Sequence, residues 1–139
     1  MNETLQPTGV PGVARTRTGG AYFEHPKRIY WGQLTGSDAT LYTAPSTLGQ
    51  LYPPKVRITD IWLCNTDSTS RTVTVQVRTG ASATATHIMS VMTIAANTVV
   101  LIECDLVLEA AEIISGFADV ASKVNIRISG REMLPQTVG

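Results

Sequence analysis

From about Leu34 onward, the chain consists of short apolar runs separated by turn residues. In the run Arg71–Thr79 the side chains alternate, with valines on one side and polar residues on the other: Val73, Val75 and Val77 against Thr72, Thr74, Gln76 and Arg78. Alternation with a period of two is typical of a strand buried on one face. The run Lys123–Arg131 repeats it, with Val124, Ile126 and Ile128 on the apolar side. We therefore predict that both runs are strands contributing to one core.

Further runs of the same kind occur along the rest of the chain. Together the predicted strands are Ala39–Thr43, Lys55–Asn65, Arg71–Thr79, His87–Ile94, Thr98–Asp105, Glu112–Ala118 and Lys123–Glu132. Short strands at regular spacing, with turn signals between them, indicate a sandwich or barrel. The sequence thus predicts an all-β fold: a single antiparallel β-sandwich, jelly-roll or immunoglobulin-like, of about seven to eight strands.

One segment fits two structures. Asp105–Ser115 contains the good helix formers Leu, Glu and Ala, which would allow a short helix. Ile113, Ile114 and Gly116 instead favour a turn at Glu109–Ala111 between two strands. We expect the turn.

Some of the predicted strands are apolar at consecutive positions. Ile61-Trp62-Leu63-Cys64 is one such stretch, and Val99-Val100-Leu101-Ile102 is another. A strand that is apolar on both sides is covered on both sides, and the sandwich core covers only one of them. The arm described below or a partner subunit must cover the other, and the pattern does not say which parity faces the core. The predicted oligomer-interface residues are Ile61, Leu63, Val100 and Ile102.

Residues 1–33 differ from the sandwich domain, which we place at residues 34–139. Glycines and prolines interrupt this first segment too often for a helix or a long strand. It also contains basic and aromatic residues, which a purely solvated tail does not need. We expect an extended N-terminal arm that is anchored by its aromatic residues, although a leader without a role has the same composition. The predicted partner-binding residues are Arg15, Arg17, Tyr22, Phe23, Lys27, Arg28, Ile29, Tyr30 and Trp31.

Composition narrows the choice of function. The chain of 139 residues suits one domain, and its 16% of charged residues is a low share, which indicates that part of the surface is hidden in contacts. Eleven basic and eleven acidic residues give no net charge, whereas nucleic-acid-binding proteins usually carry a basic excess. We expect no nucleic-acid partner. No signal segment and no apolar run of about 20 residues is present, so we expect synthesis in a cytosol and no membrane partner.

The sequence contains no motif or spacing of residues typical of a catalytic site. It lacks the nucleophile-elbow, phosphate-loop and dinucleotide-binding motifs. His25 and His87 have no sequence neighbours that would make a metal pair or a triad, and Cys64 and Cys104 are expected to be buried small hydrophobes, with a disulfide as the alternative. A group of carboxylates could contribute to a calcium site or a glycosidase pair, but a solvated acidic loop explains it as well: Glu103, Asp105, Glu109 and Glu112. We expect no enzyme, no metal and no cofactor.

The order of several segments resembles a type of small β-sandwich virion protein of tailed bacteriophages. The segments are Thr40–Pro45, the strand end Trp62–Thr66, the valine strand Val73–Val77, Thr93–Thr98, Leu106–Leu108 and the closing strand Val124–Gly130. The resemblance covers about residues 40–132 and leaves the arm outside. It implies a jelly-roll or immunoglobulin-like domain that decorates capsids or lies in the neck, tail or baseplate. It also implies assembly with the major capsid protein or other virion subunits, often as a homotrimer.

From these observations we expect a non-enzymatic virion structural protein, made in the host cytoplasm. A capsid decoration or cement protein that stabilises the major capsid lattice is the leading interpretation. A neck, tail or baseplate subunit is the alternative. A carbohydrate-binding module is a further alternative. We disfavour it because half of the eight aromatic residues belong to the arm, namely Tyr22, Phe23, Tyr30 and Trp31, which leaves Tyr42, Tyr52, Trp62 and Phe117 for a sugar platform.

Overall fold

The computed structural model describes residues 22–46, 54–80 and 85–135, with the side chains of 22, 23, 85–90, 134 and 135 left out. These ranges contain eight strands and no helix, and thus no helix that could span a membrane. The strands are β1 (Tyr22–Gln33), β2 (Ala39–Thr43), β3 (Lys55–Asn65), β4 (Arg71–Arg78), β5 (Ala85–Ile94), β6 (Thr98–Leu108), β7 (Ile113–Ala118) and β8 (Val124–Pro135).

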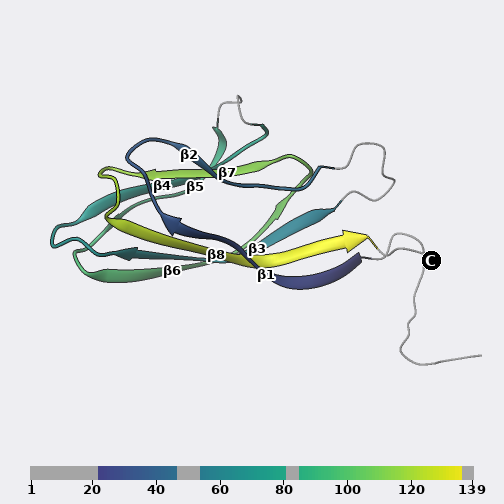
Figure 1. The fold of residues 1–139 in the computed structure, drawn as a ribbon, viewed down its shortest axis with the longest axis horizontal. Coiled ribbons are helices and arrows are strands. Elements are labelled where there is room, and N and C mark those ends of the chain that lie inside the picture. Colours follow the sequence, from purple (N-terminus) through teal and green to yellow (C-terminus); the bar gives the residue numbers. More distant parts are fainter. Residues whose placement is uncertain (1–21, 47–53, 81–84, 136–139) are drawn as a thin grey trace, which may run out of the picture.

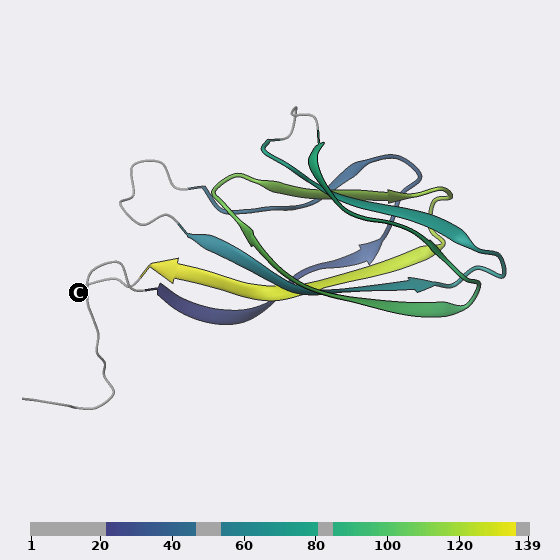
Figure 2. The same cartoon turned by 180° about the vertical axis from the view of Figure 1, so that it is seen from behind.

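The strands form two antiparallel sheets that pack face to face (Figure 1). Sheet 1 has the order β1-β8-β3-β6 and sheet 2 the order β2-β7-β4-β5, so that strands next to each other in the chain mostly lie in different sheets. The view from behind shows the same two layers (Figure 2). This strand order is that of the eight-stranded jelly roll. The predicted all-β sandwich is confirmed.

The predicted strands from β2 to β8 are all present. The bounds of β2 and β3 agree with the prediction, and β5 and β6 extend further than predicted. The segment that would also suit a helix forms a turn, because Ala111 takes a left-handed conformation with φ of 67° and the Glu112 amide donates to the Glu109 carbonyl at 3.1 Å. A left-handed residue is incompatible with a continuing helix.

The first strand corrects the expected boundary of the arm. Tyr22–Gln33 was assigned to the arm but forms β1, which pairs with β8 from Tyr22↔Pro135 to Gln33↔Asn125. Pro26 is tolerated because β1 is an edge strand, where one side of the backbone needs no ladder partner. Residues 1–21 lie outside the described part of the chain, so the rest of the arm stays a prediction.

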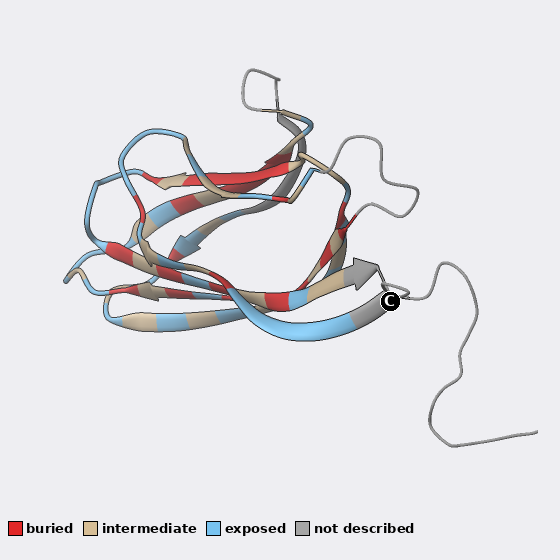
Figure 3. Cartoon of the chain, turned by 45° about the vertical axis from the view of Figure 1, so that its right-hand side comes forward, coloured by how far each residue is buried: buried red, intermediate tan, exposed pale blue. Residues whose placement is uncertain are grey.

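The core lies between the two sheets (Figure 3). The side chains predicted to share one core are all buried: Val73, Val75, Val77, Val124, Ile126 and Ile128. Gln76 was predicted to point outward, yet only 8% of it is exposed. Its neighbours Val75 and Val77 are both in the core, so β4 keeps its alternation and Gln76 is covered on the outward side of sheet 2. The residues skipped in the pairing of β4 with β5 lie on β5.

A bulge decides which side chains of β3 face the core. The register of β3 shifts between Ile58 and Asp60 against both of its neighbours. Before the bulge Val56 and Ile58 are buried, and after it Ile61 and Leu63 are buried, so the inward positions change from even to odd numbers. Trp62 therefore faces away from the core.

Candidate interaction face

Large apolar side chains gather on the side of sheet 1 that points away from the core, which we call the outer face. Among the described residues, the exposed large hydrophobic side chains on this face are Trp31 (67%), Trp62 (44%), Val99 (54%), Leu101 (41%) and Val107 (37%). Outside sheet 1 the described exposed ones are Val91 and Val120. Single exposed apolar residues are ordinary, whereas several on one face mark a contact surface.

Four residues form a continuous row across this face. The register pairs Trp31 with Arg127, Arg127 with Trp62, and Trp62 with Leu101, one residue from each strand of sheet 1. Neighbouring strands are about 4.8 Å apart, which places the backbones of the two tryptophans about 10 Å apart. The row thus alternates an aromatic ring, a cation, a second aromatic ring and an aliphatic side chain.

A bulge in β1 brings Arg28 and Trp31 to the same face. The register shifts between Arg28 and Tyr30, so that Ile29 turns into the core, where 7% of it is exposed. The Arg28 guanidinium carbon lies 4.9 Å from the centroid of the Trp31 ring, a distance typical of a cation–π contact. Without the extra residue, strict alternation would place these two side chains on opposite faces of the sheet.

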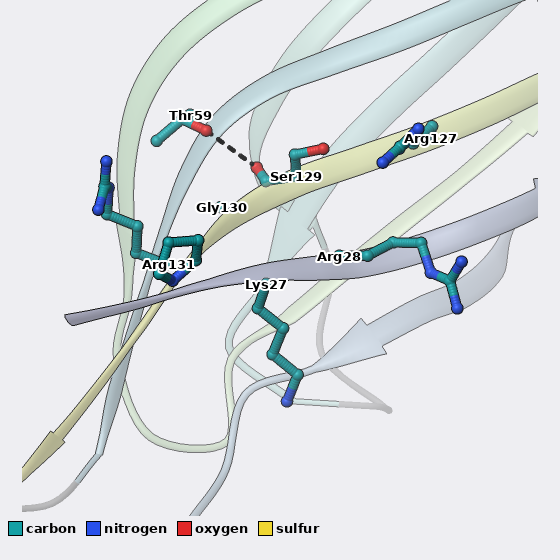
Figure 4. Close-up of a pocket in the computed structure, with 8 residues that line it drawn as sticks. Lys27, Arg28, Thr59, Arg127, Ser129, Gly130 and Arg131 are labelled. Atoms are coloured by element: carbon teal, nitrogen blue, oxygen red, sulfur yellow. Dashed lines mark hydrogen bonds between the residues drawn. The ribbon is translucent and has the colours of Figure 1, made fainter.

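Two shallow hollows lie side by side on the outer face and share Arg127 and Ser129. The first, of about 470 Å³, lies between β1, β8 and β3 and is lined by Pro26, Lys27, Arg28, Thr59, Arg127, Ser129, Gly130 and Arg131. Figure 4 shows this hollow and the hydrogen bond from the Thr59 hydroxyl to the Ser129 carbonyl, 3.3 Å long. The second, of about 670 Å³, is lined by Asp60, Trp62, Cys64, Val99, Arg127 and Ser129.

The charges on this face are divided between its two halves. The arginines of the β1–β8 half are Arg28, Arg127 and Arg131, and the carboxylates of the β3–β6 half are Asp60, Glu103 and Asp105. Within the described residues neither Arg28 nor Arg127 forms an ion pair. Arg131 Nε lies 3.8 Å from Glu24 Oε1, and Arg57 Nη1 lies 3.1 Å from Asp105 Oδ1. With Glu24 and Arg57 included, the β1–β8 half has an excess of arginines and the β3–β6 half an excess of carboxylates.

The structure separates the predicted partner-binding residues into different places. Arg15 and Arg17 lie outside the described residues, and Tyr22 and Phe23 are described only as backbone of β1. Lys27 donates to Glu132 Oε2 at 2.8 Å, and this hydrogen bond raises the pKa of Lys27. Ile29 and Tyr30 pack on the core. Among the described side chains of the predicted set, Arg28 and Trp31 project onto the outer face.

The predicted oligomer-interface residues have the wrong parity. Ile61 and Leu63 are 0% exposed, and Val100 and Ile102 pack against the core cluster, so they face inward. The surface residues of the same two stretches are Trp62, Cys64, Val99 and Leu101. Sequence reasoning recognised that both sides of these strands are apolar, but it had no signal for the bulge that sets their facing. Arg127 alternates with Ile126 and Ile128, so the pattern of the run Lys123–Arg131 puts it on the outward side, but nothing in the sequence marked it as part of a site.

Neither the carboxylates nor the cysteines belong to a metal-binding group within the described residues. No group of three or more His, Cys, Asp or Glu side chains there could hold a metal ion. His25 lies on β1, and the side chain of His87 is not described. Cys64 and Cys104 are free thiols, half-buried on opposite sides of sheet 1, since Cys64 lines the second hollow and Cys104 packs on the core. Burial raises the pKa of the Cys104 thiol, which makes the nucleophilic thiolate less available.

The sequence matches no protein-family model and is not significantly similar to any curated protein. Solved structures share the fold. A chain of the infectious bursal disease virus (IBDV) particle is 12% identical, with a TM-score of 0.50 over 91% of this chain and 35% of that one. A protein of Bacillus endospore appendages, which are disulfide-linked pili, is 10% identical, with a TM-score of 0.48 over 88% of this chain and 98% of that one. The tobacco streak virus coat protein is 10% identical, with a TM-score of 0.42 over 90% of this chain and 94% of that one. At these identities the similarity concerns the fold alone.

Proposed function

We propose that the protein is a structural subunit of a bacteriophage virion, with capsid decoration or cement as its role and the neck, tail or baseplate as the alternative location. The observation that carries the proposal is the outer face, where Trp31, Trp62, Val99, Leu101 and Val107 are exposed together. A folded domain that leaves such a face uncovered, in a chain with only 16% charged residues, is suited to contact with other subunits. The jelly-roll strand order and the resemblance to phage virion proteins support the same role.

The mechanism of such a subunit is thermodynamic. A protein that binds the assembled capsid lattice and not the separate capsid proteins stabilises the lattice by mass action. Contacts with the major capsid protein would come from residues 1–21 of the predicted arm, which lie outside the described residues, and from exposed surface of the folded domain. A homotrimer, which the resemblance implies, is one form in which the subunit would bind.

The location is tested on particles. Virions of the phage that encodes this chain would be purified and labelled with a specific antibody and gold, then viewed by electron microscopy. Label on the capsid shell supports decoration, and label on the neck, tail or baseplate supports the alternative. Full recovery of the protein in the unassembled fraction, with no label on particles, would overturn the proposal.

The contribution of the arm is tested with a deletion of residues 1–21, which leaves β1 intact. We expect the shortened protein to be folded and to bind undecorated particles more weakly than the full chain. Residues 1–21 include Arg15 and Arg17, so the double variant Arg15→Ala, Arg17→Ala shows whether charge accounts for the loss. Equal binding by the full and shortened chains would mean that the folded domain alone makes the contact.

A carbohydrate-binding role is a second candidate because of one observation. The sequence analysis assigned Trp31 to the arm, apart from Trp62, whereas the structure places both side chains on the outer face in the same row. Exposed aromatic rings on strands whose backbones are about 10 Å apart can stack against sugar rings. A glycan array tests it: specific binding that is lost in both Trp31→Ala and Trp62→Ala supports this role, and no binding excludes it.

A further inference from the structure

We propose that the outer face of sheet 1 pairs with the same face of a second copy of this chain, around a twofold axis parallel to the strands and between β8 and β3. This inference says which molecule covers the outer face. It rests on the proposed function only in treating that face as a contact surface. A twofold interface is self-complementary, because both copies use the same patch. If residue i of one copy contacts residue j of the other, then residue j of the first copy contacts residue i of the second. The outer face has this property in both its charges and its apolar row.

The order of the strands provides the charge complementarity. Sheet 1 has the order β1-β8-β3-β6, so its midline runs between β8 and β3. Rotation about this midline places β1 and β8 of one copy over β6 and β3 of the other. The half with more arginines then faces the half with more carboxylates. Arg131 lies opposite Arg57 of the second copy, and each of these two arginines keeps a carboxylate of its own chain, Glu24 and Asp105. In the row Arg28, Ser129, Asp60, Glu103, the rotation places Arg28 opposite Glu103 of the second copy.

The apolar row is complementary under the same rotation. Trp31 lies opposite Leu101 of the second copy, and Arg127 lies opposite its Trp62, because the row has one residue on each strand. A guanidinium over an indole is a favourable cation–π pair, and the twofold axis creates it twice. Arg127, which has no ion pair among the described residues, thereby gains a partner, and the exposed rings lose their contact with water.

Other ways of stacking two copies are less favourable. A twofold axis across the strands would place the half with more arginines on the same half of the second copy, and like charges in contact oppose association. In a trimer with threefold symmetry, the outer face of one copy does not pair with the same face of another copy. The face measures roughly 19 Å by 37 Å from the spacing of four strands and the length of β6, or about 700 Å². This approaches the area of about 800 Å² per partner that a standard interface buries.

Cys64 provides a probe that the chain already contains. It faces outward on β3, next to the proposed axis, in the row Gln33, Asn125, Cys64, Val99. Face-to-face sheets are about 10 Å apart, so the two Cys64 thiols of a dimer would lie within reach of a short bismaleimide cross-linker. Cys104 points to the opposite side of the sheet and would not be cross-linked across the axis.

The experiment is sedimentation velocity on the full chain, with bismaleimide cross-linking on the same samples. We expect a dimer that is cross-linked through Cys64, with loss of the cross-link in Cys64→Ser and its retention in Cys104→Ser. Arg28→Glu and Glu103→Arg should each weaken the dimer at least about tenfold, since each places like charges together twice. The double variant, which exchanges the two charges, should restore the dimer, a result that a folding defect cannot produce.

Lys123→Glu is the matched control, because it makes the same change of charge at an exposed residue outside the face. It should leave the dimer unchanged. A monomer at all concentrations, a trimer, or a dimer that is insensitive to both single charge variants would overturn the inference. Glycan binding by the full-length dimer through Trp31 and Trp62 would also overturn it. These measurements use isolated protein, so their failure is distinguishable from failure of the virion proposal, which is read from labelled particles.

Discussion

The side-chain amide of Asn65 donates a hydrogen bond to the carbonyl oxygen of Ile94 at 3.0 Å, and so joins the last residue of β3 in sheet 1 to the last residue of β5 in sheet 2. Asn65 is 0% exposed. Its amide nitrogen also lies 2.8 Å from the Thr69 carbonyl and 3.1 Å from the Ala95 carbonyl, and its oxygen accepts from the Asp67 amide at 2.9 Å. One buried side chain thus holds two turns together at this end of the sandwich.

Replacing Asn65 should therefore destabilise the fold. Asn65→Ala leaves the buried Ile94 carbonyl without this donor and removes the bonds that hold both turns, and we expect the free energy of unfolding to fall by about 2 kcal/mol. Urea unfolding followed by fluorescence would measure the change. Asn125→Ala, at a half-buried position on the outer face, is the control and should cost less. Equal losses at the two positions would contradict the structural role of Asn65.

Two adjacent residues of β8 should respond differently to truncation. Ile126 is 1% exposed in the core, and Ile126→Ala should lower the free energy of unfolding by about 2–5 kcal/mol. Arg127 is exposed on the opposite side of the same strand, and Arg127→Ala should change it by less than about 0.5 kcal/mol. Similar losses in chemical denaturation of the two variants would mean that the facing of β8 is wrong.

The fold should tolerate deletions from the N-terminus up to the start of β1 and no further. Removal of residues 1–21 leaves every described strand in place, and the circular dichroism spectrum and the melting temperature should change little. Removal of residues 1–30 deletes most of β1, removes Ile29 from the core and exposes the edge of β8. An uncovered strand edge and core favour aggregation, so this longer deletion should be insoluble or unfolded. A stable, monomeric product of the longer deletion would contradict the assignment of β1 to the sheet.

Acid should weaken the fold through Asp67. Arg71 Nε donates to Asp67 Oδ2 at 2.7 Å and the Ser68 amide donates to Asp67 Oδ1 at 2.7 Å, and these hydrogen bonds lower the pKa of Asp67. A carboxyl group with a lowered pKa in the folded state stabilises the fold at neutral pH. This stabilisation decreases as the pH falls below the ordinary aspartate value and is lost below the folded-state pKa.

The measurement compares unfolding at neutral pH and below the ordinary aspartate pKa. Asp67→Asn should lose less stability between the two conditions than the unaltered protein does. Arg71→Gln removes the main cause of the lowered pKa and should reduce the pH dependence in the same direction. An unchanged pH dependence in both variants would show that this pair does not contribute to acid sensitivity.

The sequence by itself determined the fold class and most of the strands. Val73, Val75 and Val77 alternate with polar residues in a single register, and such a pattern can bury its apolar side only as a strand. The turn before β7 was also predictable, since β-branched residues follow a short segment of helix formers. In each case the preference is local, so neighbouring residues contain all the information that is needed.

Only the tertiary structure decided β1 and the composition of the outer face. Tyr22–Gln33 contains Pro26 and gave no strand pattern, but pairing with β8 satisfies its backbone and the edge position tolerates the proline. The bulges after Arg28 and Ile58 change the parity of β1 and β3, and thereby place Trp31, Trp62 and Arg28 on one face. A bulge is fixed by how a strand fits its neighbours, strands that lie far away in the sequence. For this reason local alternation could predict that an apolar face exists and could not say which residues form it.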